Sequence, residues 1–210
     1  MRVCQQLLVF SCCFMFLNLY DSMCMCGRPL VPLRSGRYNS VAMPIMDSHA
    51  LDFISYSYDQ TLRYGVKLGQ LLKSQDFLCL SGNLGSGKTA LAIGVARGWG
   101  SLESATSPSY ILVNEYSRAD GAQLHHMDCY RLSSATDADH IGIDERLQSG
   151  AVLIVEWPEH IESWIPKQKL WITMSYITED KRSIQMRADG NHFVQLLAEF
   201  RKSAFQHGSA

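Results

Sequence analysis

One stretch of the sequence combines glycines, a lysine and a threonine at a spacing that binds phosphate. It runs from Gly82 to Thr89 and reads Gly-Asn-Leu-Gly-Ser-Gly-Lys-Thr. The apolar run Phe77–Leu80 precedes it, and the helix-forming run Ala90–Arg97 follows it. A strand, a glycine-rich turn and a helix in this order form a P-loop, whose backbone N–H groups and helix N-terminus surround phosphate oxygens. The segment therefore predicts a site for a nucleoside triphosphate.

The residue types of this loop predict how the triphosphate is held. The Lys88 side chain can reach the β- and γ-phosphate oxygens, and the Thr89 hydroxyl can serve as a ligand of Mg²⁺. A glycine-rich turn that binds nothing is the alternative, and the flanking strand and helix argue against it. The predicted nucleotide-binding residues are Asn83, Leu84, Gly85, Ser86, Gly87, Lys88, Thr89 and Ala90.

Two carboxylates close apolar strand-like runs further along the chain. Asp128 ends the first run and Glu156 ends the second, which is the more apolar one. Ligands of open α/β sheets bind beyond the carboxyl ends of the strands, so we expect both acids near the Mg²⁺ that Thr89 helps to hold. Glu156 is predicted to be the Walker B acid, which coordinates the metal through water or orients the attacking water. Asp128 is the other candidate for these two roles. Alternatively, either acid caps the turn that follows it.

Three hydroxyl residues, Thr106, Ser107 and Ser109, lie between the predicted P-loop helix and the next strand. Switch segments of P-loop proteins lie at this point of the chain and respond to the γ-phosphate. These residues are therefore a candidate switch-like segment. An ordinary turn rich in serine and threonine is the alternative interpretation.

Four further residues near the predicted strand ends have several possible roles. Arg131 could contact phosphate or form a surface ion pair. His125 and His126 point to opposite faces of one strand, so at most one of them faces the site, and we expect a packed or solvated imidazole in each case. Trp157 could pack near the nucleotide or in the core.

The elements that must position these residues alternate between strand and helix patterns. This alternation predicts an α/β fold: a single P-loop NTPase domain with a central, mostly parallel sheet flanked by helices and with antiparallel additions. The predicted elements are an edge strand at 51–57, a helix from Ser57 to about Ser74, a strand at 77–80, the P-loop helix ended by Gly98 and Gly100, strands at 111–116 and 123–128, a helix at 136–148 interrupted by Gly142, a strand at 151–156, a hairpin of strands 170–177 and 183–187, and a last helix capped by Asn191.

The composition excludes several classes of function. The net charge is −1, with 19 basic and 20 acidic residues, so no broad field draws the chain to a nucleic acid or an acidic membrane. The sequence has no Asn-Lys-x-Asp motif for guanine, no arginine-rich lid of a small-molecule kinase and no Ser-His-Asp or Cys-His set for acyl transfer. Cys79 and Cys129 are predicted to be buried, reduced thiols.

Residues 1–46 differ from the rest because they hold five of the seven cysteines and the apolar run Leu7–Leu19. That run is shorter than the roughly 20 residues of a membrane span. An upstream stretch ahead of the true start is favoured, and an organellar targeting segment or an anchor are the alternatives. We predict an extension at 1–46 that is disordered or absent from the mature protein, a P-loop ATPase domain at 47–200 and a flexible tail at 201–210.

Five motifs follow one another at spacings that together are specific. They are Gly82–Thr89, Thr106–Tyr110, His126–Leu132, Gly142–Glu145 and Val155–Pro158. With them the chain, over roughly residues 50–190, resembles the TsaE (YjeE) family, the P-loop ATPases of bacterial tRNA threonylcarbamoyladenosine synthesis. Ser109 and Cys129 are mild departures from the family pattern, and residues 1–46 have no counterpart in it.

The resemblance implies an ATPase that is weak alone and works with the transferase subunit TsaD and its companion TsaB. Those proteins transfer a threonylcarbamoyl group to the adenosine beside the anticodon of certain tRNAs, and ATP drives a turnover or reset step. Carried over by position, Lys88 and Thr89 bind phosphate and Mg²⁺, Asp128 is a candidate for catalysis and Glu156 for the metal, while Thr106–Ser109 is switch-like.

The family also implies a cytoplasmic protein that contacts tRNA only through the complex and needs no membrane. An organellar location follows if residues 1–46 are retained. Two functions of other classes stay open on the sequence. One is a binding module gated by nucleotide, in which hydrolysis is incidental, and the other is a small-molecule kinase.

Overall fold

Seven strands form one sheet in the part of the chain that the structure, a computed structural model, describes: residues 47–103, 112–132 and 142–205. The predicted extension at 1–46 and the switch-like residues Thr106, Ser107 and Ser109 lie outside the described residues. The strands are β1 (Ala50–Ser55), β2 (Phe77–Ser81), β3 (Val113–Ser117), β4 (Gln123–Asp128), β5 (Val152–Glu156), β6 (Lys169–Tyr176) and β7 (Arg182–Asp189).

The order of the strands across the sheet is β1-β7-β6-β2-β5-β4-β3. The four inner strands β6, β2, β5 and β4 run parallel to one another. The outer pairings, β3 with β4, β6 with β7 and β7 with β1, are antiparallel. The predicted class, a mostly parallel sheet with antiparallel additions, is confirmed, and the P-loop strand β2 lies in its middle.

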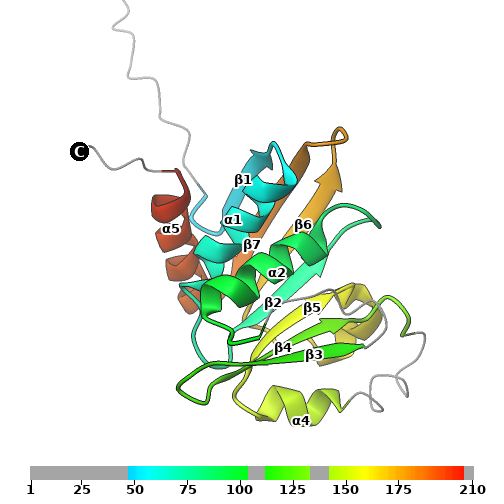
Figure 1. Ribbon diagram of the computed structural model, residues 1–210, viewed down its shortest axis with the longest axis vertical. Coiled ribbons are helices and arrows are strands. Elements are labelled where there is room, and N and C mark those ends of the chain that lie inside the picture. Colours follow the sequence, from blue (N-terminus) through cyan, green and yellow to red (C-terminus); the bar gives the residue numbers. More distant parts are fainter. Residues whose placement is uncertain (1–46, 104–111, 133–141, 206–210) are drawn as a thin grey trace, which may run out of the picture. The chain divides into compact units, whose positions relative to one another are not determined.

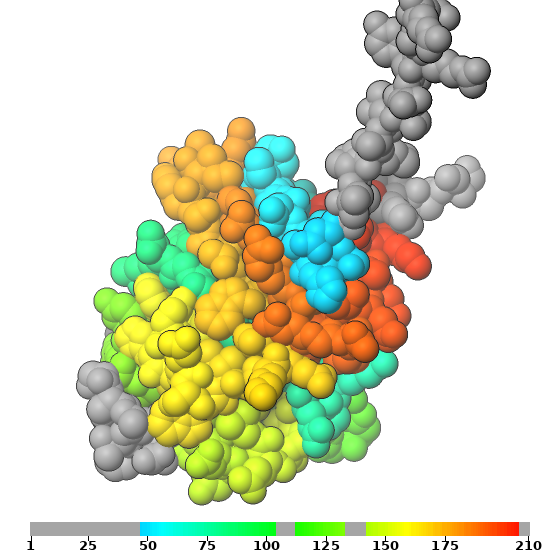
Figure 2. Space-filling view, turned by 180° about the vertical axis from the view of Figure 1, so that it is seen from behind, coloured from blue at the N-terminus to red at the C-terminus, as the bar shows by residue number. Residues whose placement is uncertain are grey.

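Helices cover both faces of the parallel strands. On one face lie α1 (Tyr58–Gly69), α2 (Lys88–Trp99) and α5 (Asn191–Phe205), and Figure 1 shows α1 and α2 next to each other in front of the sheet. The other face carries the short helix α4 (Ile143–Gln148) and the 3-10 helix η1 (Pro158–Trp164). Figure 2 views the molecule from behind, where the yellow chain around β5 and η1 covers the middle.

The alternation of side chains along the strands explains the two layers. In β2, Leu78 and Leu80 belong to the larger core beneath α1, α2 and α5, whereas Phe77 and Cys79 belong to the smaller core beneath α4 and η1. Every residue from Phe77 to Leu80 is buried. A strand buried on both faces is continuously apolar, and this pattern is what the sequence showed.

Helices α1 and α2 meet backbone to backbone through glycines. A Cβ atom added at Gly94 would lie 2.3 Å from the carbonyl oxygen of Leu62, and one added at Gly98 would lie 2.0 Å from that of Val66. No side chain of ordinary size fits between atoms this close. The glycines therefore set the separation of the two helices.

The structure confirms the predicted start of α1 and corrects its end. The Ser57 hydroxyl accepts a hydrogen bond from the backbone N–H of Gln60 at 3.1 Å, as a capping residue does. The helix ends at Gly69 and not near Ser74, because tight turns follow and Gln75 takes a positive φ of 69°. The segment η1, which begins at a proline, was not predicted.

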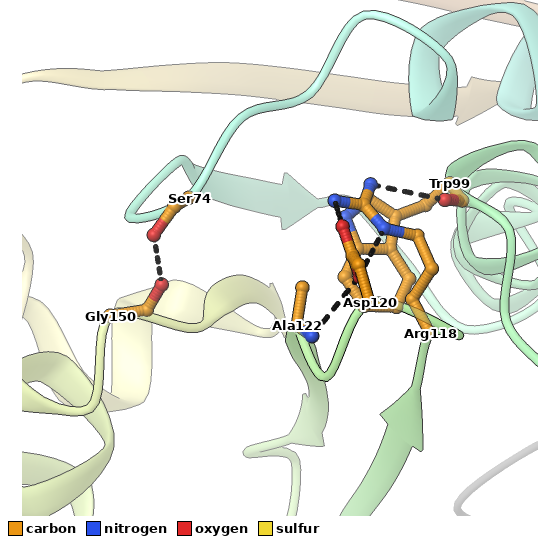
Figure 3. A network of polar contacts seen from close by, with 6 residues as sticks. All are labelled: Ser74, Trp99, Arg118, Asp120, Ala122 and Gly150. Atoms are coloured by element: carbon orange, nitrogen blue, oxygen red, sulfur yellow. Dashed lines mark hydrogen bonds and ion pairs between the residues drawn. The ribbon is translucent and has the colours of Figure 1, made fainter.

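A polar network joins the end of α2 to the turn between β3 and β4. The Arg118 guanidinium donates to both carboxylate oxygens of Asp120, at 2.9 and 2.7 Å, and its centre lies 4.8 Å from the centroid of the Trp99 ring. Figure 3 shows Arg118 and Asp120 beside Trp99 at the turn between β3 and β4, together with the hydrogen bond from Ser74 to Gly150. These contacts hold the turn between β3 and β4 against the C-terminal end of α2.

Within the three described ranges, no helix has the length and apolar character needed to cross a membrane.

Candidate functional site

The P-loop connects the end of β2 to the start of α2 by a turn that needs glycine at two places. Gly82 has φ 133°, and a Cβ atom there would lie 2.1 Å from the carbonyl oxygen of Met174 on β6. Gly87 has φ 100° and is the N-cap of α2. Only glycine adopts such angles at little cost. The loop therefore returns directly to the helix, and α2 begins at Lys88.

The Lys88 ammonium lies inside the loop that it belongs to. Its Nζ donates to the carbonyl oxygens of Gly82 at 2.6 Å and Asn83 at 3.0 Å, and it lies 4.0 Å from the centroid of the Trp157 ring. Burial lowers the pKa of this ammonium, and the charges of Glu156 and Asp128 oppose that shift. These contacts hold the positive charge at the position where a P-loop binds phosphate.

Glu156 stands between the loop and strand β4. Its Oε2 accepts a hydrogen bond from the Thr89 hydroxyl at 3.0 Å, and its Oε1 lies 2.9 Å from Nε2 of His126. The exposed fraction is 2% for Glu156 and 0% for His126, so the carboxylate is bonded on both oxygens inside the protein. The sequence predicted Glu156 and Thr89 near each other and did not predict the contact with His126.

The two neighbouring histidines do point to opposite faces, as the strand pattern predicted. His126 faces Glu156, whereas Nδ1 of His125 lies 3.4 Å from Nη1 of Arg146 on α4. Both imidazoles are buried, so neither is solvated. His126 is packed, as expected, and its ring also hydrogen-bonds to the candidate metal-binding carboxylate, which makes it the one histidine of the pair that faces the site.

Asp128 lies beside Glu156, because the two are paired residues of the parallel strands β4 and β5. Its Oδ1 accepts a hydrogen bond from the backbone N–H of Tyr130 at 3.1 Å. The acid therefore caps the turn after β4, which was the alternative to a role in the site. It also lines the cavity described next, so both interpretations fit its position.

A cavity of about 510 Å³ opens between the P-loop and the carboxyl ends of the strands. The loop, both acids, Arg131 and Trp157 all contribute to its wall. Three lining residues were missed by sequence reasoning: Tyr58 at the start of α1, Tyr130 and Arg182 at the start of β7. The full lining is Tyr58, Leu84, Gly85, Gly87, Lys88, Thr89, Ala90, Asp128, Tyr130, Arg131, Glu156, Trp157 and Arg182.

Two predicted loop residues, Asn83 and Ser86, do not line the cavity. The Asn83 side chain is exposed, and its carbonyl oxygen binds Lys88. Ser86 is 1% exposed, and its hydroxyl has no hydrogen-bond partner in the structure. The roles predicted for these two residues stay predictions.

The Trp157 ring forms one wall of the cavity from a strained backbone. Its φ of 58° and ψ of 52° are left-handed, an uncommon conformation for a bulky residue, and strain of this kind is concentrated at functional sites. The backbone N–H of Trp157 donates to the carbonyl oxygen of Leu80 on β2 at 3.1 Å. The ring centroid lies 4.9 Å from that of Tyr130. Together these contacts keep the indole against Lys88.

The oxygen atoms at this edge of the sheet suit magnesium. The Thr89 hydroxyl and the carboxylates of Glu156 and Asp128 are ligands of the kind that this hard cation prefers. Among the described residues, no group of three or more His, Cys, Asp or Glu side chains could hold a metal ion alone. Such a set fits a cation that shares its coordination with phosphate and water.

The comparisons with known proteins agree with this geometry. The family model "Threonylcarbamoyl adenosine biosynthesis protein TsaE" matches residues 55–184. The chain belongs to the TsaE family. The match spans the P-loop, both acids, β6 and the first residues of β7, so it includes the cavity wall from Tyr58 to Arg182.

Individual TsaE proteins are similar to the chain over most of their own length. The TsaE protein of Bacillus subtilis is 36% identical over 128 residues, which are 60% of this chain and 78% of the relative. That of Treponema pallidum is 34% identical over 131 residues, 62% of this chain and 96% of the relative. Both are named "tRNA threonylcarbamoyladenosine biosynthesis protein TsaE".

A solved structure has the same fold. The crystal structure of YdiB from Bacillus subtilis superposes with a TM-score of 0.61 at 30% sequence identity. The superposition covers 73% of this chain and 95% of the YdiB chain. The P-loop NTPase class that the sequence predicted is confirmed by this likeness together with the sheet topology.

Proposed function

We propose that the chain is a magnesium-dependent ATPase that acts in the synthesis of threonylcarbamoyladenosine in tRNA. The observation that carries the proposal is the convergence of Lys88, Thr89 and Glu156 on one wall of the cavity of about 510 Å³. These are the cation, the hydroxyl and the acid that a P-loop NTPase requires. The names of the relatives supply the pathway.

The residues of the cavity divide the work of hydrolysis. Lys88 exchanges the loop carbonyls for phosphate oxygens when the nucleotide binds, and its charge favours the developing negative charge. Thr89 and Glu156 would hold Mg²⁺, which neutralises charge on the β- and γ-phosphates. Asp128, paired with Glu156 across the strands, is the acid free of the Thr89 contact and is our candidate for orienting the attacking water.

The nucleoside part of ATP has candidate contacts that the motifs do not contain. Tyr58 is 60% exposed and Leu84 is 80% exposed, and both line the cavity beside the loop. Side chains of this kind offer an apolar surface to a base. We therefore assign adenosine to the part of the cavity that Tyr58 and Leu84 line.

We further propose that the ATPase works with the TsaD and TsaB proteins and meets tRNA only through them. The net charge of −1 supports this because it provides no broad basic surface for RNA. A cytoplasmic location follows from the tRNA pathway, and an organellar one would follow from a retained targeting extension at 1–46.

The test is ATP hydrolysis by the full chain, alone and with TsaD and TsaB. Replacement of Glu156 by Gln keeps the shape of the side chain and removes its negative charge. We expect ATP to bind Glu156→Gln while the partner-stimulated rate falls by roughly 100-fold or more. The matched control is Glu162→Gln on the exposed side of η1, which should leave the rate unchanged.

Three results would contradict the proposal. Equal rates with and without TsaD and TsaB would exclude the partnership. Repeated rounds of tRNA modification by Glu156→Gln would favour the nucleotide-gated module. Phosphate found on an added metabolite, and not released into solution, would indicate a kinase.

A further inference from the structure

His126 is the most deeply buried polar side chain at the site, and the proposed chemistry assigns it no role. It is 0% exposed and lies on β4, on the same face as Leu124 and beneath α2. Its Nε2 is 2.9 Å from Oε1 of Glu156, and its Nδ1 has no hydrogen-bond partner in the structure. One polar contact therefore fixes this ring.

The direction of that hydrogen bond follows from the chemistry of the two groups. An ionised carboxylate only accepts, so Nε2 of His126 carries the hydrogen that faces Oε1 of Glu156. Burying an imidazole with one nitrogen unpaired is unfavourable, and a leucine would fill similar space without that cost. The imidazole is better explained by what it does to Glu156 than by packing.

The same carboxylate is bonded from its other side. Thr89 donates to Oε2 at 3.0 Å while His126 occupies Oε1, so the chain Thr89–Glu156–His126 runs from the first turn of α2 to the middle of β4. A carboxylate held at one oxygen presents its second oxygen in a defined direction. Partners that orient a metal-binding carboxylate in this way tune the affinity for the metal.

We propose that His126 is a positioning residue that orients the Glu156 carboxylate for magnesium in the nucleotide complex. The inference rests on the proposed function, since it concerns the same Mg²⁺ site. The Nε2–H of His126 holds Oε1, and Oε2 is thereby left facing Thr89 and the cavity. His126 touches neither the nucleotide nor the metal.

The position of the donor makes the proposal specific. The side-chain nitrogen of Gln lies about as far from the backbone as Nε2 of His, whereas that of Asn lies near the place of Nδ1. His126→Gln therefore keeps the donor that faces Glu156, and His126→Asn moves it to the side where no partner lies. His125→Gln is the matched control, because His125 is the next residue on the same strand and faces Arg146.

The experiment measures ADP binding by calorimetry at a series of Mg²⁺ concentrations and again in EDTA. For His126→Asn we expect the Mg²⁺ concentration at half-saturation to rise by about 10-fold to 100-fold, with the affinity for ADP in EDTA unchanged. His126→Gln and His125→Gln should each stay near the wild-type value. This readout does not depend on hydrolysis.

Each outcome decides between the claims. If His126→Asn and His126→Gln lower the melting temperature alike and leave the Mg²⁺ dependence unchanged, His126 has only a packing role and the proposal is wrong. If the wild type itself shows no Mg²⁺-dependent binding of ADP, the proposed function fails first, and the two failures are thereby distinguished.

A measurement on the wild type covers the case in which His126→Asn does not fold. Long-range ¹H–¹⁵N spectra of the histidine rings report which nitrogen carries hydrogen. We expect the Nε2–H form of His126 with and without Mg²⁺ and ADP. A ring that carries its hydrogen on Nδ1 in the complex would overturn the proposal.

Discussion

At the scale of single residues, the site is held together by groups that already have partners. Lys88 binds two carbonyl oxygens of its own loop and the face of Trp157, and Thr89 binds Glu156. In the proposed nucleotide complex, phosphate and metal would therefore replace contacts that these side chains already make. Exchange of one set of partners for another limits the free energy that binding can yield.

His125 gives the chain a predicted dependence on pH. Burial lowers the pKa of this imidazole, and the nearby Arg146 charge lowers it further. A histidine whose folded pKa is below its ordinary value of about 6.5 favours the folded state while neutral, and that stability is lost as the pH falls through the ordinary value. We expect the urea midpoint to fall between pH 7.5 and pH 5.5, and to fall less in His125→Gln. The same pH dependence in both proteins would contradict this.

Sequence reasoning reached the residues whose role is local and missed those whose role depends on pairing between distant segments. The loop from Gly82 to Thr89 and the strand-end acids were predicted because order along the chain determines them. The contact of His126 with Glu156 joins two strands that are neighbours only in the sheet. Tyr58 and Arg182 reach the cavity from elements at either end of the domain, and no motif marks them.

At the scale of elements, the sequence patterns predicted whether a segment is a helix or a strand better than they predicted the residue at which it ends. The strands β2, β4 and β5 were predicted almost to the residue because turn residues and acids bound them. Helix α1 was expected to continue to about Ser74 because its apolar spacing continues, but Leu71 and Leu72 pack from turns after Gly69. Hydrophobic spacing alone does not separate a helix from the turn that follows it.

The contact between α1 and α2 provides a test in which the usual effect of a substitution is reversed. Alanine in place of glycine within a helix normally stabilises it by about 1 kcal/mol. At Gly98 the new methyl group would lie 2.0 Å from the carbonyl oxygen of Val66, and that atom belongs to the backbone. We expect Gly98→Ala to lower the free energy of unfolding by roughly 2 kcal/mol or more, measured by urea denaturation.

The control for this change is an alanine placed where nothing is packed. Lys202→Ala on the exposed side of α5 should stay within about 0.5 kcal/mol of the wild type. A Gly98→Ala protein as stable as the wild type would contradict this, because it would mean that α1 and α2 can move slightly apart without any loss of stability.

At the scale of the whole molecule, the parallel centre and the antiparallel flank contribute different walls to one cavity. Strands β2, β4 and β5 end at the loop and the acids, while β7 brings Arg182. The fold class was predictable from the alternation of helix and strand patterns. The order of the strands was not, because the connection from β5 to β6 passes β2, so that β6 pairs with β2 on the side opposite β5.

Ligand binding should stabilise the folded chain as a whole. At 100 times its dissociation constant, a nucleotide that binds only the native state adds about 2.7 kcal/mol. For a domain of this size we expect Mg²⁺ and ADP to raise the melting temperature by roughly 5–11 °C. Differential scanning calorimetry measures this shift, and Lys88→Ala should abolish it. An undiminished shift in Lys88→Ala would show that the nucleotide binds elsewhere.

The glycine contact between the two helices also decides which parts of the cavity can adjust to its occupant. Tyr58 opens α1 and Lys88 opens α2, and the two helices touch through their main chains at Gly94 and Gly98. Because no layer of side chains separates the two helices, we expect them to move together as one rigid unit. We therefore expect Tyr58 and Lys88 to keep a fixed separation, so that any adjustment of the cavity to a bound nucleotide falls on its other lining residues.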